Sequence, residues 1–297
     1  MQIANILIGS NGFMGSQLLQ IFEREKQFCL KIPRIELEII PQISSDINAQ
    51  INNDKFLSIN LYHFGGTTEW IKIHEDPKVF MKRSIELAKH VIDLKSRLEL
   101  PVRTVLASTG KVYSKSEIPL HEESEISPSN VLGETKLAIE NFMERNISEN
   151  ENLIIGRIFN VYGPSQKDNF LVPTILKQIE NENNKIELGN LTDIRDYLYV
   201  TDVVYALKTL AEQKIKPPKK EIFNVGSGVG LSPIEIANLL MDLLKAKKKI
   251  VSIKSRKRFD ENPFEVANNS KLRSLGWKPK VNLDEGLSKC ITKSVKQ

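Results

Sequence analysis

The sequence predicts an α/β protein: a doubly wound parallel sheet with a smaller, discontinuous C-terminal lobe. Short apolar runs alternate with amphipathic helical patterns, which is typical of parallel strands joined by crossover helices. A turn with three glycines follows the first apolar run. The regular alternation weakens over roughly the last hundred residues, so we expect these to form a second, more mixed part.

The expected elements follow in order along the chain. The first strand, "IANILIGS" (3–10), leads into a helix, "GSQLLQIFERE" (15–25). Later buried strands are expected from the β-branched and apolar runs "RTVLAST" (103–109), "NLIIGRIFN" (152–160) and "IFNVGSG" (222–228). Amphipathic helices are expected at "PKVFMKRSIELAKHVIDLKSR" (77–97) and "ETKLAIENFMERN" (134–146). The segment "PPKK" (217–220) marks an exposed break.

Composition narrows the class of protein. The chain has 297 residues, enough for a large core, and its net charge is +5 with lysines clustered at 214–220 and 245–249. We interpret these clusters as solvated faces, because no nucleic-acid-binding motif accompanies them. No apolar run reaches the roughly 18 residues of a membrane span. Cys29 and Cys290 are too few for a disulfide framework and are not spaced for a metal. We therefore expect a cytoplasmic protein without metal, nucleic acid or membrane partners.

The glycine-containing turn is the first candidate functional site. "IGSNGFMG" places Gly9, Gly12 and Gly15 between the first strand and the first helix. Glycine permits a tight turn and the close approach of a phosphate, and the helix N-terminus offers amide donors and the positive end of a dipole. The GxxGxxG spacing is weak by itself. Its position between strand and helix predicts a dinucleotide-binding turn.

Further segments carry a resemblance to a known family. They are, in order, "YHFGG" (62–66), "ASTGKVY" (107–113), "GRIFNVYGP" (156–164), "RDYLYVTDV" (195–203), "FNVGSG" (223–228) and "NNSKLRSLGWKPKVNLDEGL" (268–287). The chain resembles the extended short-chain dehydrogenase/reductase family, specifically its NAD(P)-dependent nucleotide-sugar epimerases, dehydratases and reductases. The resemblance implies a Rossmann-type dinucleotide-binding domain from 1–163 and 197–224, and a nucleotide-sugar-binding lobe from 164–196 and 225–297. It also implies a homodimer through helices 78–97 and 132–146.

The resemblance implies a set of cofactor-binding residues. They lie in the glycine turn, at the end of the third strand and on the later helix: Gly9, Asn11, Gly12, Phe13, Met14, Gly15, Phe64, Gly65 and Lys136. NAD-preferring members carry an acid at the end of the second strand, and "FCLKIPRIE" (28–36) has none there. Arg34 stands about where an arginine would meet the extra phosphate of NADP. The cofactor is thus NAD or NADP, with a slight preference for NADP.

The family's catalytic pair is only half present. In a YxxxK motif, the tyrosine takes or gives the proton of a sugar hydroxyl while a hydride moves, and the lysine favours its ionised form. When "NVLGETK" (130–136) is aligned on this motif, Leu132 occupies the tyrosine position. The resemblance leaves Lys136 to contact the nicotinamide ribose and Thr109 to contact the reacting sugar oxygen. From the residues alone, Lys136 would be a surface lysine paired with Glu140.

Three explanations of Leu132 remain open. Lys111, two residues after Thr109, could supply a relocated acid–base, as in dehydratase relatives whose "STDK" resembles "STGK" (108–111). Gly110 replaces the catalytic aspartate of that motif, which weighs against simple dehydration. Alternatively, the chain binds both ligands and is regulatory, or the alignment at Leu132 is wrong.

The substrate side is also inferred from the resemblance. Asn160 matches a residue that meets the sugar or the diphosphate, Arg195 and Arg258 match arginines that grip the diphosphate, and Glu261 matches an acid on the nucleotide's ribose. Asp196 and Asp202 are expected to hold the loop. The prediction is an NAD(P)-dependent oxidoreductase or epimerase of a nucleotide-activated sugar, in deoxy-sugar or surface polysaccharide biosynthesis.

Overall fold

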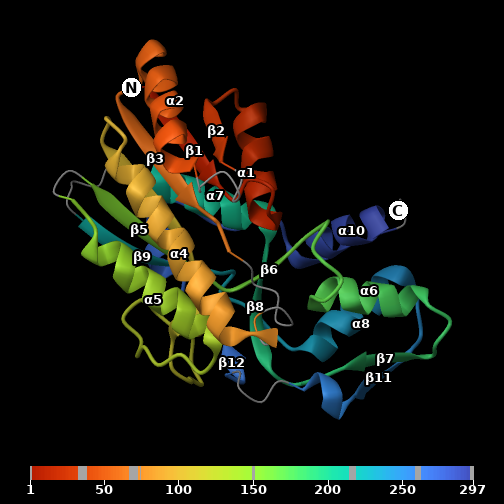
Figure 1. Ribbon diagram of the computed structural model, residues 1–297. Helices are drawn as coiled ribbons and strands as arrows, with labels where there is room; N and C mark the ends of the chain where they lie inside the picture. The colour runs from red at the N-terminus through yellow and green to blue at the C-terminus, as the bar shows by residue number, and fades with distance from the viewer. Residues whose placement is uncertain are drawn as a thin grey trace. The chain divides into compact units, whose positions relative to one another are not determined.

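The computed structural model describes residues 2–32, 39–66, 73, 75–148, 151–213, 219–257 and 262–294 (Figure 1). The chain divides into two compact units. Unit 1 comprises 1–112, 131–157 and 204–223, and unit 2 comprises 113–130, 158–203 and 224–297. These units are defined by compactness, so the expected division of the chain by ligand stays a prediction.

Unit 1 is built on a six-stranded sheet in the order β2-β1-β3-β4-β5-β9. The strands β1–β2, β1–β3 and β3–β4 pair in parallel. The strands β1 and β5 are buried along almost their whole length, which explains why their sequences are continuous apolar runs rather than alternating ones. The bounds are β1 (Ile3–Ile8), β2 (Cys29–Ile32), β3 (Ser58–His63), β4 (Val102–Thr109), β5 (Asn152–Ile158) and β9 (Lys219–Val225).

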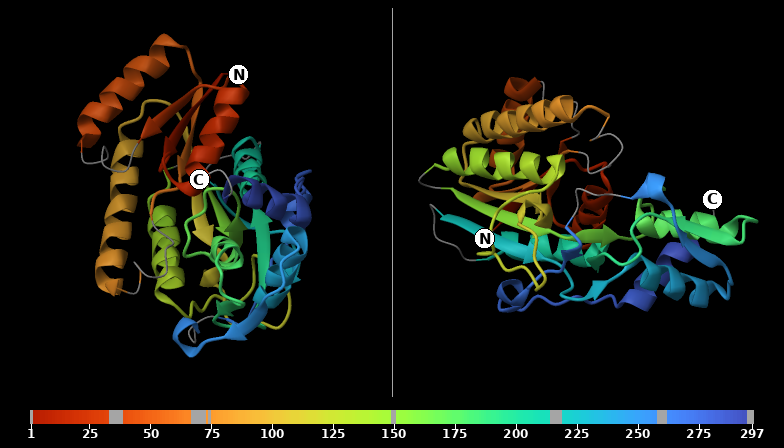
Figure 2. Two further views of the ribbon diagram at one scale, coloured as in Figure 1. Left: turned by 90° about the vertical axis from the view of Figure 1, so that its right-hand side faces the viewer. Right: turned by 90° about the horizontal axis from the view of Figure 1, so that it is seen from below.

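Helices cover both faces of this sheet, as Figure 2 shows. On one face, α2, α4 and α5 pack on β1, β3, β4 and β5 through one apolar cluster. On the other face α1 packs on β1 and β3, where the rings of Phe22 and Tyr62 lie 5.6 Å apart. The bounds are α1 (Phe13–Arg24), α2 (Ile40–Asn53), α4 (Pro77–Ser96), α5 (Val131–Arg145) and α7 (Val200–Ala211). The expected doubly wound α/β class is confirmed.

Local sequence signals explain where two of the helices begin. Asp76 caps α4, because its carboxylate accepts a hydrogen bond of 3.0 Å from the Val79 amide, and Pro77 stands at the first helical position. In unit 2, Ser232 and Glu235 form a complete capping box at the start of α8 (Pro233–Leu244). By contrast, no side chain caps α1 at Gly12.

Unit 2 is a mixed assembly of short strands and helices. The central strand β8 pairs in parallel with β6 and β12 and antiparallel with β10, while β7 and β11 form a separate parallel pair. The strand bounds are β6 (Asn160–Tyr162), β7 (Lys185–Leu188), β8 (Ile194–Tyr199), β10 (Gly230–Leu231), β11 (Lys249–Ser252) and β12 (Phe264–Glu265). The helix bounds are α6 (Leu171–Glu180), α8 (Pro233–Leu244), α9 (Ser270–Arg273) and α10 (Leu283–Ser294), with 3₁₀ turns η2 (Gly110–Val112, in unit 1) and η3 (Lys254–Arg256).

Buried aspartates tie unit 2 together. The fully buried Asp196 carboxylate accepts hydrogen bonds from the Ser227 amide and hydroxyl, both at 2.7 Å, and from the amides of Gly228 and Ala267. The Asp202 carboxylate accepts one from the Val281 amide at 3.0 Å. Both side chains therefore hold loops in place, the role that the sequence analysis gave them. A helix of the length and apolarity that a membrane crossing requires does not occur among the described residues.

Candidate active site

The glycine turn brings three backbone segments of unit 1 into close contact. A Cβ atom at Gly15 would lie 2.1 Å from the Gly9 carbonyl oxygen, so only glycine fits there. Gly9 itself has a φ of +85°, and a Cβ atom there would lie 2.9 Å from the Phe64 carbonyl carbon. The turn and the segment after β3 thus form a narrow backbone cradle at the start of α1.

The cradle is suited to an anion. The first turn of α1 holds no acidic side chain and Gly12 supplies no side-chain cap, so the amide groups at this helix end remain available. The hydroxyl of Ser10 is buried there and has no hydrogen-bond partner among the described residues. Unpaired amides, a helix dipole and an unpartnered hydroxyl are what a dinucleotide pyrophosphate requires, so the residues present fit such a group.

The other predicted cofactor-binding residues lie beside this turn. Asn11 is exposed, and Phe13 and Met14 are partly buried in the first turn of α1. Phe64 and Gly65 directly follow β3, where the Phe64 ring meets Tyr62 edge-on at 6.1 Å. Arg34, on which the preference for NADP depends, lies outside the described residues.

Thr109 and Lys136 are brought to the same strand, β4. Thr109 is its last residue, and Lys136, on α5, donates a hydrogen bond of 2.8 Å from Nζ to the carbonyl oxygen of Ala107. Leu132, one turn earlier on α5, is partly buried, as is Lys136. The ammonium group thus lies at Ala107, two residues before Thr109 on β4. Lys136 and Leu132 share one face of α5.

Glu140 does not pair with Lys136. Its carboxylate accepts hydrogen bonds from Arg157 Nη2 at 2.8 Å and Nε at 3.3 Å, and a further one from the Ser108 hydroxyl. Arg157 and Glu140 are both about 4% exposed. These contacts connect α5 to β4 and β5 next to Thr109, so Glu140 helps to position the end of β4. The surface ion pair between Lys136 and Glu140 that the sequence suggested is not formed.

Burial changes the protonation of two nearby side chains. Desolvation lowers the pKa of Lys136 to about 8, with Glu140 acting in the opposite direction. Burial, with a smaller contribution from the charge of Lys136, lowers the pKa of His63 to about 3. His63 is therefore neutral at physiological pH, and its Nδ1 has no hydrogen-bond partner within the described part of the chain.

Lys111, the sequence-predicted alternative to the tyrosine, and the nearby Tyr113 have different surroundings. Lys111 lies in the 3₁₀ turn η2, where its backbone amide donates to the Thr109 hydroxyl oxygen at 3.3 Å. Tyr113 is 3% exposed and donates its hydroxyl proton to Asn224 Oδ1 at 2.7 Å within unit 2. The phenol of Tyr113 is thus buried and bound to Asn224.

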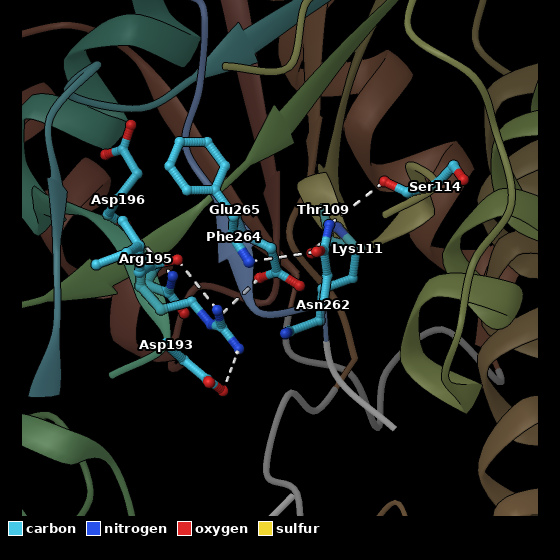
Figure 3. Close-up of polar contacts among 11 residues, drawn as sticks. Thr109, Lys111, Ser114, Asp193, Arg195, Asp196, Asn262, Phe264 and Glu265 are labelled. Atoms are coloured by element: carbon cyan, nitrogen blue, oxygen red, sulfur yellow. Dashed lines mark hydrogen bonds and ion pairs between the residues drawn. The ribbon is translucent and has the colours of Figure 1, made fainter. Parts of the chain in front are cut away.

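In unit 2, Arg195 lies beside acidic groups (Figure 3). Its guanidinium lies 3.2 Å from an Asp193 carboxylate oxygen and 3.7 Å from one of Glu265, and it donates to the Ile194 carbonyl. Asn160 Nδ2 donates to the Asp196 carbonyl oxygen at 3.3 Å. Arg258 and Glu261 lie outside the described residues.

Sequence reasoning missed three residues of these surroundings. Neither Asp193 nor Glu265 belongs to a motif used above. Asp193 stands two residues before Arg195, whereas Glu265 reaches it only because the fold pairs β12 with β8. His63 lies inside the "YHFGG" segment, but its burial beside Gly65 could not be read from that string. No group of three or more potential metal ligands occurs in the described ranges.

A profile of the NAD dependent epimerase/dehydratase family matches residues 6–226. The match covers most of the chain, so the protein belongs to this family.

Its relatives act on nucleotide-activated sugars. The chain is 30% identical over 191 residues to GDP-6-deoxy-D-mannose reductase of Pseudomonas aeruginosa, covering 61% of this chain and 62% of that one. It is 28% identical over 250 residues to ADP-L-glycero-D-manno-heptose-6-epimerase of Brachyspira hyodysenteriae, covering 80% and 76%. The first of these alignments spans less than two thirds of the relative's own length.

Solved structures agree on the fold over the whole chain. RMD from Pseudomonas aeruginosa, complexed with NADPH, has a TM-score of 0.81 at 23% identity and covers 99% of this chain and 100% of its own. UDP-glucose 4-epimerase from Thermotoga maritima, with UDP-glucose, has a TM-score of 0.81 at 21% identity and covers 98% and 99%. These structures confirm the Rossmann-type fold, and the profile match confirms the family resemblance.

Proposed function

We propose that the chain is an NAD(P)-dependent oxidoreductase or epimerase of a nucleotide-activated sugar, acting in deoxy-sugar or surface polysaccharide biosynthesis. The observation that carries the proposal is the glycine cradle, in which a Cβ at Gly15 would lie 2.1 Å from the Gly9 carbonyl oxygen beside an uncapped helix end. The relatives named above are the second support.

The cradle supports the following cofactor contacts as part of the proposal. The amides at the start of α1 would hold the pyrophosphate, the backbone at Phe64 and Gly65 would line the dinucleotide, and Lys136 would contact the nicotinamide ribose. The bound nicotinamide supplies or accepts a hydride. Arg34 favours NADP by charge, because a guanidinium suits the extra phosphate.

Around the reacting sugar oxygen, Thr109 would donate a hydrogen bond. Its hydroxyl oxygen already accepts from the Lys111 amide, which leaves its proton free to point elsewhere. Lys111 is a candidate acid–base from the next turn. A dehydratase that uses Lys111 is an alternative, but Gly110 gives it no neighbouring carboxylate.

A second candidate function follows from Leu132. A leucine cannot titrate, and losing a positioned acid–base group typically lowers a rate by about 100- to 10,000-fold. A protein that binds dinucleotide and nucleotide sugar without turnover, as a regulatory subunit, would have the same cradle and the same lobe.

The nucleotide sugar would be held by unit 2 through Asn160, Arg195, Arg258 and Glu261. An assembly into homodimers through α4 and α5 completes the proposal. Multi-angle light scattering on the full chain tests it, because a mass of about 34 kDa rather than twice that value would contradict a dimer.

Cofactor binding and turnover are tested together. NADPH and NADH are titrated into the protein by fluorescence, and Arg34→Ala is expected to weaken NADPH more than NADH. Absorbance of the reduced nicotinamide is then followed with a panel of nucleotide sugars and their 4-keto derivatives. Binding with turnover supports the enzyme, binding of both ligands without turnover supports the regulatory alternative, and failure to bind either dinucleotide rejects both.

A further inference from the structure

We infer that Lys136 itself carries the proton of the reaction, in place of the tyrosine that Leu132 replaces. The inference rests on the proposed function and names the acid–base group of the same site. It follows from where the ammonium lies, from what surrounds it and from what the neighbouring groups are unable to do.

The position of the ammonium is set by β4. Lys136 Nζ donates to the Ala107 carbonyl oxygen, and Thr109 follows two residues later on the same strand. A strand rises about 3.3 Å per residue, so the two positions are about 7 Å apart along the backbone. An ammonium and a hydroxyl at this spacing can hydrogen-bond to one substrate oxygen between them. Leu132 is on the same helix face and offers no competing donor.

Among the described residues, no carboxylate forms an ion pair with the ammonium. Glu140, one helical turn further along α5, is bound to Arg157 of β5 and to Ser108 of β4. His63, which faces it from β3, is neutral because burial lowers its pKa to about 3. Within the described part of the chain, the Lys136 ammonium makes one hydrogen bond, to a backbone carbonyl that is a neutral acceptor.

This environment makes the group suited to proton transfer near neutral pH. Burial lowers the Lys136 pKa to about 8, so protonated and neutral forms are both populated at ordinary pH. A general acid or base works best when its pKa lies close to the working pH. An ordinary lysine, with a pKa near 10.4, would hold its proton too tightly to serve as a base.

The step balances as follows in the reductive direction. The keto carbon of the sugar accepts a hydride from the reduced nicotinamide, and the two π electrons of the C=O bond move to its oxygen. That oxygen takes one proton from Lys136 Nζ, while Thr109 donates a hydrogen bond to it. Lys136 is left as a neutral amine, which regains its proton from water. Oxidation of a sugar hydroxyl is the same step in reverse.

The first test needs neither cofactor nor substrate. The protein is labelled with ¹³C-lysine, and the ¹³Cε resonance that disappears in Lys136→Arg is followed between pH 6 and pH 11. An inflection near pH 8 supports the inference. An inflection near pH 10 would overturn it, because the amine would then be too basic, and this result would leave the proposed function standing.

The second test separates proton transfer from ribose binding. Lys136→Arg keeps a positive charge that donates hydrogen bonds but does not titrate below pH 12. We expect kcat to fall by about 100- to 10,000-fold, and the decline of the wild-type reduction rate above pH 8 to disappear. Dinucleotide affinity is measured in parallel. A fall in affinity with an unchanged kcat and pH profile would make Lys136 a binding residue only and overturn the inference.

A rescue variant guards against simple damage to the site. In the Lys136→Arg background, Leu132→Tyr adds a phenol at the family's usual position and is expected to restore part of kcat. Leu132→Phe is the matched control, because it adds the ring without the hydroxyl and should restore nothing. If Lys111→Gln rather than Lys136→Arg removes the pH dependence near 8, the proton carrier is Lys111 and the inference is wrong.

Discussion

A cationic side chain of unit 1, Lys136, and one of unit 2, Arg195, have opposite electrostatic surroundings. In unit 1 the Lys136 ammonium is held by a backbone carbonyl, and burial lowers its pKa to about 8. In unit 2 Arg195 lies against the carboxylates of Asp193 and Glu265. A lysine without a carboxylate partner can lose its proton, whereas a guanidinium between two acids keeps its charge but has it largely neutralised. The Lys136 ammonium is therefore suited to transfer a proton, whereas the Arg195 guanidinium is suited to fix the positions of its neighbours.

Unit 1 also contains a cation that is paired with a carboxylate, as Arg195 is in unit 2. Arg157 and Glu140 form a buried pair a single helical turn from Lys136. Because Glu140 is bound to Arg157, it raises the Lys136 pKa only partly against desolvation. The comparison therefore rests on Lys136, Arg195 and Arg157, and the surroundings of each can be changed separately by mutation.

The largest effect is expected from breaking the pair of Glu140 and Arg157. Glu140→Gln removes the carboxylate that pairs with the buried Arg157 guanidinium, and breaking a buried ion pair from one side typically costs about 3–5 kcal/mol of unfolding free energy. Urea denaturation of the purified protein measures this loss.

A double variant supplies the control. Glu140→Met combined with Arg157→Met replaces both charges by apolar groups and should be clearly more stable than Glu140→Gln. If the double variant is the less stable of the two, the cost comes from lost packing and not from an unpaired charge.

The next effect concerns the glycine cradle. Gly15→Ala would place Cβ 2.1 Å from the Gly9 carbonyl oxygen, so the turn must open. Overpacking of this kind costs about 1–3 kcal/mol, and the displaced amides should no longer bind a dinucleotide. Calorimetric titration with NADPH measures the loss. Gly276→Ala is the control for binding in unit 2. It places alanine at a φ of +86° and therefore also costs stability, but no atom lies within 4 Å of its added Cβ, so dinucleotide binding should be unchanged.

The order of the first strand, glycine turn and helix could be read from the sequence because each signal is local. The apolar run at 3–8, the turn glycines and the amphipathic helix are short-range patterns, and they correspond to β1 and α1. The second strand was expected from 28–36, and Cys29–Ile32 forms β2. Unit 2 could be anticipated only as an irregular part, since its short strands β10 and β12 are two residues long and pair across the chain.

The candidate site shows the same limit at the level of single residues. Thr109, Lys136 and the leucine at 132 could be named from motif spacing. The partners of these residues could not, because Lys136 and Glu140 at i and i+4 are as compatible with an ion pair as with the observed contacts to Ala107 and Arg157. Which partner a buried charge takes depends on which strand lies beneath the helix, and that is a property of the tertiary structure.

A smaller effect is expected from releasing Arg195. Asp193→Asn removes one of its two carboxylate neighbours, and on the proposed function this should strengthen binding of a nucleoside diphosphate by about 3- to 10-fold, since less of the guanidinium charge is neutralised. Calorimetry with the diphosphate alone measures the change. Asp168→Asn is the matched control, because Asp168 pairs with Lys177 on an exposed surface of the same unit. Weaker binding in Asp193→Asn would mean that the aspartate orients Arg195 rather than competing for it.

The last prediction concerns the pH dependence of stability, an effect that develops gradually over an interval of pH. The pKa of Lys136 is about 8 in the folded protein and near 10.4 in an unfolded chain, so between these values only the unfolded state keeps the proton. Unfolding then takes up a proton, and the unfolding free energy contributed by this group rises as pH increases from 8 to about 10.4. Lys136→Met removes the group, so the wild type should gain stability relative to this variant over that interval. Thermal melts at pH 7.5, 9 and 10 measure the difference. A constant difference would mean that the ammonium titrates no more easily than an ordinary lysine, and the contrast with Arg195 would then lie in geometry alone.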